Sequence, residues 1–270
     1  MFQQLVVPID GSAASWDAVP TAARLASSVD GKVEVVTVVD RLGDVVKSER
    51  ELAEGIERLG KLIVEPTYSV LAGDEIAPTL ANYVEARPGM TILMSSHGHG
   101  RSAAVLGSIV DSVLRRMFGP IIVVGPHVDE GAGSPEGSYV VAVDGSESSE
   151  AIVPIAQAWA IEFGAMPWLV EVIEPSQPVD IDVFESAYAA RLASRIVEDT
   201  GHEVSYDVLH DAHPARALVD YAERLPASLI FMCTHGRTGL ARLRLGSVAA
   251  ETVRHATCPV VLYRPPELQD

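Results

Sequence analysis

The sequence predicts two doubly wound α/β domains in one chain, each with a five-stranded parallel sheet and helices on both faces. Three observations support this fold class: an internal repeat, alternation of short β-branched runs with helical patterns, and runs such as TILMS and IIVVG that are apolar throughout. Strands that are apolar on both faces are typical of parallel sheets covered by helices on both sides. Strands and helices that alternate, joined by right-handed crossovers, give the doubly wound arrangement.

The internal repeat is visible at four places that occur in the same order in both copies. The matching segments are LVVPIDGS (5–12) with YVVAVDGS (139–146), SSHGHG (95–100) with CTHGRT (233–238), LGS (106–108) with LGS (245–247), and GPIIVV (119–124) with CPVVLY (258–263). Matches that keep their order at nearly constant spacing indicate a duplicated domain. We expect domains over residues 1–126 and 138–270, joined by a Gly-, Pro- and Ser-containing linker over 127–137.

Each copy is expected to alternate strands and helices in the same order. In the first copy, strands are predicted near 3–9, 32–39, 67–71, 91–95 and 121–125. Helices are predicted between them, near 14–29, 44–60, 74–86 and 107–118. In the second copy, strands are predicted near 138–143, 166–173, 203–209, 228–232 and 259–263.

The fifth strand of each copy, PIIVVG or PVVLY, is apolar and ends its domain. We therefore expect it at a sheet edge, where an exposed apolar strand invites pairing. The two halves are predicted to pair through these strands as an intrachain pseudo-dimer, and a further homodimer of two chains is left open.

Composition and charge exclude several classes of protein. The 270 residues carry 20 Lys and Arg against 37 Asp and Glu, a net charge of −17, which argues against nucleic acid or an anionic membrane as the partner. No apolar run approaches the roughly 18–20 residues of a membrane helix, and no signal peptide is visible. Two cysteines make no disulfide framework. We expect a cytoplasmic protein.

A ligand site is expected beyond the carboxyl ends of the strands, where the strand order of a doubly wound sheet reverses. The first strand ends at Asp10 or Asp144, and the fourth ends at Ser95 or Cys233. A helix then begins at a Gly-Ser pair, and its free N–H groups and positive dipole end suit a phosphate. The alternative is that each Gly-Ser is only a helix cap; its recurrence beside a glycine-rich turn in both halves favours the phosphate site.

The distribution of charge also favours an anion site. Neither 86–110 nor 224–250 contains a single Asp or Glu, and the second window carries Arg237, Arg242 and Arg244. Such windows in an acidic protein suggest an anion site, although Arg242 and Arg244 fit solvated helix residues equally well. The chain has no GxxxxGK[ST] and no GxGxxG after its first strand, which excludes a P-loop NTPase and disfavours a dinucleotide oxidoreductase.

The duplicated Asp-Gly-Ser and the His-Gly turn before a helix-opening Gly-Ser resemble the universal stress protein family, once in each half. That family's signature is Gly, two residues, Gly, nine residues, then Gly-Ser or Gly-Thr. The second half reads Cys233, Gly236, nine residues, then Gly246-Ser247. The first half reads Ser95, Gly98, eight residues, then Gly107-Ser108, so it is one residue shorter.

The resemblance implies an adenine nucleotide alpha hydrolase-like fold and two unequal sites for ATP, with or without Mg²⁺, in a regulator of stress response or dormancy. Adenine would be held near Val38 or Val172 and beside Asp10 or Asp144. Phosphates would meet the backbone amides of Gly98, Gly107, Ser108 and Ile109 in the first half, and of Gly236, Gly246, Ser247 and Val248 in the second.

Several neighbouring residues have two interpretations. Met94 and Met232 either pack against the nucleoside or fill the core. His97 and His235 either face the ligand or orient the loop. Cys233 is a small residue at the first signature position; with Cys258 it forms either a redox pair or, by default, two buried inert thiols.

Two rival functions remain open at this stage. A slow ATP hydrolase would need a base or metal ligand near the γ-phosphate, and the loops 98–107 and 236–246 contain no carboxylate. A pseudo-dimeric scaffold with decayed sites would act only through an unknown protein partner. We expect no catalytic residue and no metal site.

Overall fold

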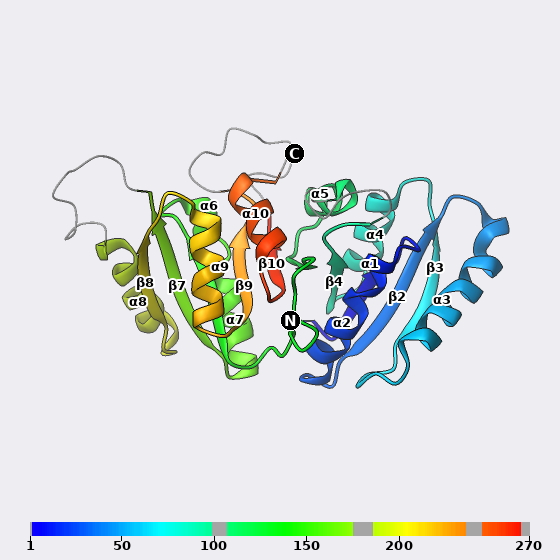
Figure 1. Cartoon of the computed structure of the whole chain (residues 1–270), viewed down its shortest axis with the longest axis horizontal. Helices are drawn as coiled ribbons and strands as arrows, with labels where there is room; N and C mark the ends of the chain where they lie inside the picture. The colour runs from blue at the N-terminus through cyan, green and yellow to red at the C-terminus, as the bar shows by residue number, and fades with distance from the viewer. Residues whose placement is uncertain (1, 99–106, 175–185, 236–244, 266–270) are drawn as a thin grey trace.

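Ten strands form one continuous sheet that runs through both halves of the chain (Figure 1). The computed structural model describes residues 2–98, 107–174, 186–235 and 245–265. Strand order across the sheet is β3-β2-β1-β4-β5-β10-β9-β6-β7-β8. The first half contributes β1 (Gln4–Pro8), β2 (Lys32–Val39), β3 (Thr67–Ala72), β4 (Met90–Ser95) and β5 (Ile121–Val124). The second half contributes β6 (Ser138–Val143), β7 (Met166–Ile173), β8 (Ser205–His210), β9 (Ala227–Cys233) and β10 (Val260–Tyr263).

The predicted fold class is confirmed. Within each half, every pair of neighbouring strands is parallel. The first strand of each half lies in the interior, with β1 between β2 and β4, and β6 between β7 and β9. Strand order therefore reverses at these positions, as the site prediction requires. Predicted and observed strands differ by at most two residues at either end.

The two halves meet at their fifth strands, which lie side by side and antiparallel. Val123 is paired with Val260, and Ile122 with Val261. All four side chains are buried, so this junction has no exposed apolar edge. The outer edges of the sheet are β3 and β8 instead.

Helices cover both faces of the sheet, and one predicted helix is broken. The first half contains α1 (Ala13–Trp16), α2 (Ala18–Ser27), α3 (Val45–Leu59), α4 (Ile76–Glu85) and α5 (Ser108–Leu114). The second half contains α6 (Glu147–Glu150), α7 (Val153–Phe163), α8 (Ser186–Thr200), α9 (Pro214–Arg224) and α10 (Ser247–His255). The helix predicted over 14–29 divides at Asp17, because Pro20 has no N–H to donate to the Trp16 carbonyl. The helix predicted to reach 118 ends at Leu114.

The hydrophobic core is shared between the halves. One cluster lies under α2 and α7, and another lies under α4, α5, α9 and α10, and each contains residues of both halves. Phe2 packs edge-on against Trp159 of the other half, with ring centroids 5.1 Å apart. The segment between the domains is also attached to them, since Asp129 N donates to the Thr257 carbonyl (2.9 Å) and Arg24 Nε donates to the Ala132 carbonyl (2.6 Å). Within the described ranges, no helix is long and apolar enough to cross a bilayer.

Candidate functional site

The end of β1 and the turn after β4 come into direct contact in the first half. Gly98 lies against the carboxylate of Asp10, and a Cβ on Gly98 would collide with Oδ2 of that carboxylate. The absence of a side chain at position 98 allows Asp10 to approach this closely. This contact brings together two residues that lie 88 positions apart in the sequence and that are predicted to belong to one ligand site.

Both aspartates also hold a turn of their own, which sequence analysis missed. Oδ1 of Asp10 accepts from the backbone N–H (2.9 Å) and the hydroxyl (2.6 Å) of Ser12. Asp144 does the same for Ser146, at 3.0 and 2.6 Å. The glycine between them has a positive φ, 86° at Gly11 and 82° at position 145. The signal was the Asp-Gly-Ser spacing itself, because Asp side chains commonly accept from the backbone two residues on.

The serine of each turn continues the chain of hydrogen bonds into the next helix. Ser12 Oγ accepts from Ser15 N (3.2 Å) at the start of α1, and Ser146 Oγ accepts from Ser149 N (3.1 Å) at the start of α6. Each is the N-cap residue of its helix. One oxygen of each aspartate thus belongs to the hydrogen-bonded turn between the strand and the next helix.

The helices after β4 and β9 begin where the sequence predicts. Glycine is the N-cap residue of both α5 and α10, so no N-cap side chain accepts from their first turns. Gly107 N donates to the Ser96 carbonyl (2.8 Å), and Gly246 N donates to the Thr234 carbonyl (2.9 Å). A Cβ would lie 3.3 Å from the Ser96 oxygen at position 107 and only 2.8 Å from the Thr234 oxygen at position 246.

Some of the other residues predicted to bind phosphate near these helices lie in the described part of the chain, and some lie outside it. Ser108 and Ser247 are exposed, and Ile109 and Val248 are half-buried. Gly236 and the three arginines of the second loop lie outside the described residues. The predicted phosphate contacts at the Gly107 and Gly246 amides are wrong in this structure, because both N–H groups already donate to carbonyls of the protein. The amides of Ser108, Ile109, Ser247 and Val248 remain the candidates at the two helix starts.

The two histidines of the His-Gly turns are held by the residue that precedes them. His97 Nδ1 lies 3.1 Å from Ser96 Oγ, and His235 Nδ1 lies 3.1 Å from Thr234 Oγ1. His235 is buried, whereas His97 is half-buried. The same bond in both halves favours the interpretation that these rings orient the turn.

The two methionines lie in the core. Met94 and Met232 are each 5% exposed and belong to the cluster under α4, α5, α9 and α10. Core packing therefore explains their side chains without a ligand. At the end of β4, Ser95 Oγ donates to the His97 carbonyl (3.0 Å), so this hydroxyl also serves the turn.

Both cysteines are buried thiols. Cys233 Sγ donates weakly to the Ser149 carbonyl at 3.7 Å. Burial raises the pKa of Cys233 and of Cys258 to about 12 from an ordinary value of 9.0. Thiolate is the reactive form of cysteine, so neither thiol suits redox chemistry near neutral pH.

This leads to a prediction about thiol reactivity. In the folded chain at pH 8, neither cysteine should react with a disulfide reagent such as dithionitrobenzoate over an hour, because the thiolate fraction is low and the sulfur is covered. In urea, both should react within minutes. Rapid release of one or two equivalents from the folded chain would show that the burial is incomplete.

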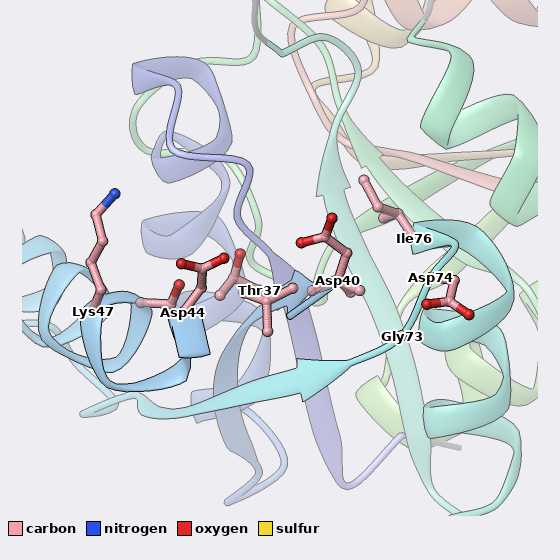
Figure 2. Close-up of a pocket in the computed structure, with 10 residues that line it drawn as sticks. Thr37, Asp40, Asp44, Lys47, Gly73, Asp74 and Ile76 are labelled. Atoms are coloured by element: carbon pink, nitrogen blue, oxygen red, sulfur yellow. The ribbon is translucent and has the colours of Figure 1, made fainter. Parts of the chain in front are cut away.

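A cavity of about 470 Å³ opens at the carboxyl ends of β2 and β3, beside the predicted adenine contact Val38 (Figure 2). Three carboxylates line it, from Asp40, Asp44 and Asp74, together with Lys47. These aspartates are not among the predicted site residues, although Asp40 directly follows β2 and Asp74 lies two residues after β3. Val172 is half-buried at the corresponding end of β7. With three carboxylates and one lysine in its lining, the cavity suits hydroxyl and amino groups better than phosphate.

Comparisons with known proteins agree with this architecture. The universal stress protein family model matches residues 1–125 and 139–264. Universal stress protein Rv1996 of Mycobacterium tuberculosis is 28% identical, over 97% of this chain and 95% of that protein. A universal stress protein structure from Archaeoglobus fulgidus has a TM-score of 0.66 at 18% identity and covers 97% of this chain and 98% of its own. Another from that organism, solved in complex with dAMP, is 24% identical over 47% of this chain and 96% of its own, with a TM-score of 0.38.

Proposed function

Because this chain belongs to the universal stress protein family, we propose that it binds one adenine nucleotide in each half. The nucleoside would lie beside Asp10 or Asp144, and the phosphates would accept from the first-turn amides of α5 or α10. The observation that carries this proposal is the contact of Gly98 with the Asp10 carboxylate. It joins the end of β1, where the nucleoside is proposed to lie, to the turn after β4, which precedes the proposed phosphate position at α5.

The distribution of charge supports this orientation of the nucleotide. Asp40, Asp44 and Asp74 lie around the cavity next to Val38, where the ribose hydroxyls and the adenine amino group would donate. The windows 86–110 and 224–250, which lead into α5 and α10, contain no Asp or Glu, and the acidic residue that follows the first window, Asp111 in the first turn of α5, is paired with Arg115 at 2.9 Å. A phosphate would therefore be repelled at the first place and accommodated at the second.

The starts of the two helices also fit a phosphate. Glycine at the N-cap leaves the first-turn N–H groups without an N-cap side chain, and the positive end of a helix dipole favours an anion. We propose ATP as the ligand, with or without Mg²⁺. The second site is proposed to be the tighter one, since its loop has the family's length and carries three arginines in sequence.

The proposed role is regulation of a stress response or of dormancy in the cytoplasm, with catalysis at most weak. Ligand occupancy would be read by a protein partner, and the two halves would act as an intrachain pseudo-dimer through β5 and β10. A homodimer of two such chains is part of the same proposal. Size-exclusion chromatography with light scattering, with and without ATP, tests the oligomeric state.

A proline substitution at the helix starts tests the phosphate contacts. The residue before a proline prefers ψ between about 120° and 160°, and the N-cap glycines already have ψ of 141° at position 107 and 149° at position 246. Ser247→Pro should therefore keep α10 while removing one N–H donor. Loss of one hydrogen bond to a charged group, worth about 1.5–3 kcal/mol, should weaken ATP binding at the second site roughly tenfold or more in calorimetry.

Matched variants separate the amide from the hydroxyl and one site from the other. Ser247→Ala keeps the N–H and should bind nearly as well as the parent chain. Ser108→Pro should affect only the weaker binding event. Equal losses from Ser247→Pro and Ser247→Ala would argue against a phosphate at the α10 amide, and a larger loss from Ser108→Pro would reverse the order of the sites.

A further inference from the structure

A side chain of the first half reaches the start of α10 in the second half. Oδ1 of Asp111, on α5, accepts from the backbone N–H of Leu245 at 3.2 Å. Leu245 lies two residues before Ser247, the first residue of α10, whose amide is proposed to contact the phosphate. This hydrogen bond therefore links α5 of the first half to the segment just before α10 of the second half.

The Asp111 carboxylate is held in place on both sides. Its Oδ2 pairs with Arg115 Nη2, one helical turn further along α5, at 2.9 Å. The two side chains are only 20% and 31% exposed, so water screens this arrangement less than an open surface pair. The arginine also offsets the negative charge that Asp111 would otherwise present to a nearby phosphate.

Two successive backbone N–H groups before α10 thus donate to acceptors in different halves of the chain. The Leu245 N–H donates to Asp111 of the first half, and the Gly246 N–H donates to Thr234 of its own half. An N–H that points into a fixed acceptor restricts the backbone on either side of it. A backbone that is already ordered loses less conformational entropy when the ligand binds, and this favours affinity.

The acceptor of this bond is not repeated at the equivalent position of the second half. The LGS match pairs Leu245 with Leu106, and the same spacing pairs Asp111 with Ala250 on α10. An alanine side chain has no acceptor, so Ala250 cannot make the bond that Asp111 makes. The two halves therefore differ at this position, with an aspartate on α5 and an alanine on α10.

We infer that Asp111 is a positioning residue for nucleotide binding at the second site, which is incomplete without the first half. This inference rests on the proposed function. Asp111 touches no ligand in this role; it acts through Leu245 and the N-terminal turn of α10. The second site has this support from Asp111 of the first half, whereas the equivalent position on α10 is an alanine, Ala250.

The test compares Asp111→Ala with Asp111→Asn in the full chain, with ATP binding measured by calorimetry in an Asp10→Asn background that weakens the first site. Asp111→Ala removes the acceptor and should weaken binding about fivefold, the effect of one modest hydrogen bond. Asp111→Asn keeps an acceptor and should bind within about twofold of the parent. Asp220→Ala, which breaks an exposed ion pair with Arg216 on α9, is the matched control and should have no effect.

Other outcomes would overturn the inference. A purely electrostatic role would make both Asp111 variants bind more tightly, because both remove a negative charge. Unchanged binding in Asp111→Ala, while the parent chain binds, would refute the positioning role alone. Absence of binding in the parent chain would instead refute the proposed function.

Hydrogen exchange provides a second readout that does not depend on nucleotide. The amide of Leu245 should exchange faster in Asp111→Ala than in the parent chain, and Asp111→Asn should restore its protection. Equal protection in all three chains would refute the bond on which the inference depends. A general loss of fold would instead raise exchange in β1 and β6 as well, so the two effects are distinguishable.

Discussion

Ile122→Asp should destabilise the whole chain by roughly 5 kcal/mol, the combined effect of losing a buried isoleucine and burying an unpaired charge. Ile122 is fully buried in β5, opposite Val261 of β10. Because each hydrophobic cluster contains residues of both halves, the effect should reach the second half as well. Urea unfolding followed by circular dichroism and tryptophan fluorescence measures it.

Tryptophan fluorescence reports on the unfolding of both halves. Trp16 lies in the first half, and Trp159 and Trp168 lie in the second. The parent chain should unfold in one transition seen equally by both probes. Val46→Asp, at a position 76% exposed, is the control and should change stability by no more than about 0.5 kcal/mol. If Ile122→Asp left the second half with its original midpoint, the halves would be independent of each other.

The second large effect concerns stabilisation by ligand. ATP at a hundredfold excess over Kd should stabilise the chain by about 2.7 kcal/mol for one site, or roughly 5–10 °C in Tm for a chain of this size. The double variant Asp10→Asn, Asp144→Asn should lose most of this shift. Asparagine can keep Oδ1 as the acceptor of the serine turn, but its amide nitrogen presents a donor where the carboxylate presents an acceptor.

Asparagine is preferable to alanine here because of the two turns. Asp10→Ala or Asp144→Ala would also remove the acceptor for Ser12 or Ser146, and loss of such a helix-start bond costs about 1 kcal/mol. The unliganded double Asn variant should melt within a few degrees of the parent chain. A full ATP shift in this variant would remove the aspartates from the proposed site.

Much of the fold could be predicted because the same pattern of segments occurs in both halves of the sequence. The repeated segments gave the domain organisation, and the β-branched runs gave strands such as 32–39 and 166–173 with the observed limits. The break at Asp17 was missed because apolar periodicity continues through it. Gly55 was missed as well: it lies in the middle of α3 because a Cβ there would collide with the Trp16 ring, a long-range contact that local pattern does not reveal.

The candidate site was predictable in part for the same reason. Residues at strand ends, such as Asp10 and Gly98, follow from strand order, and the structure brings these two together. The cavity beside Val38 depends on how β2, β3 and α3 pack, and the bond from Asp111 to Leu245 depends on the pairing of β5 with β10. Sequence pattern predicts which strands pair but leaves their register open.

The central claim is that each half binds one adenine nucleotide. Calorimetric titration of the nucleotide-free full chain with ATP, ADP and AMP, each with and without Mg²⁺, tests it most directly. The predicted result is two molecules bound per chain by at least one of these nucleotides, in a tighter and a weaker event. Absence of binding by all three nucleotides at millimolar concentration would contradict the claim and leave a scaffold with decayed sites.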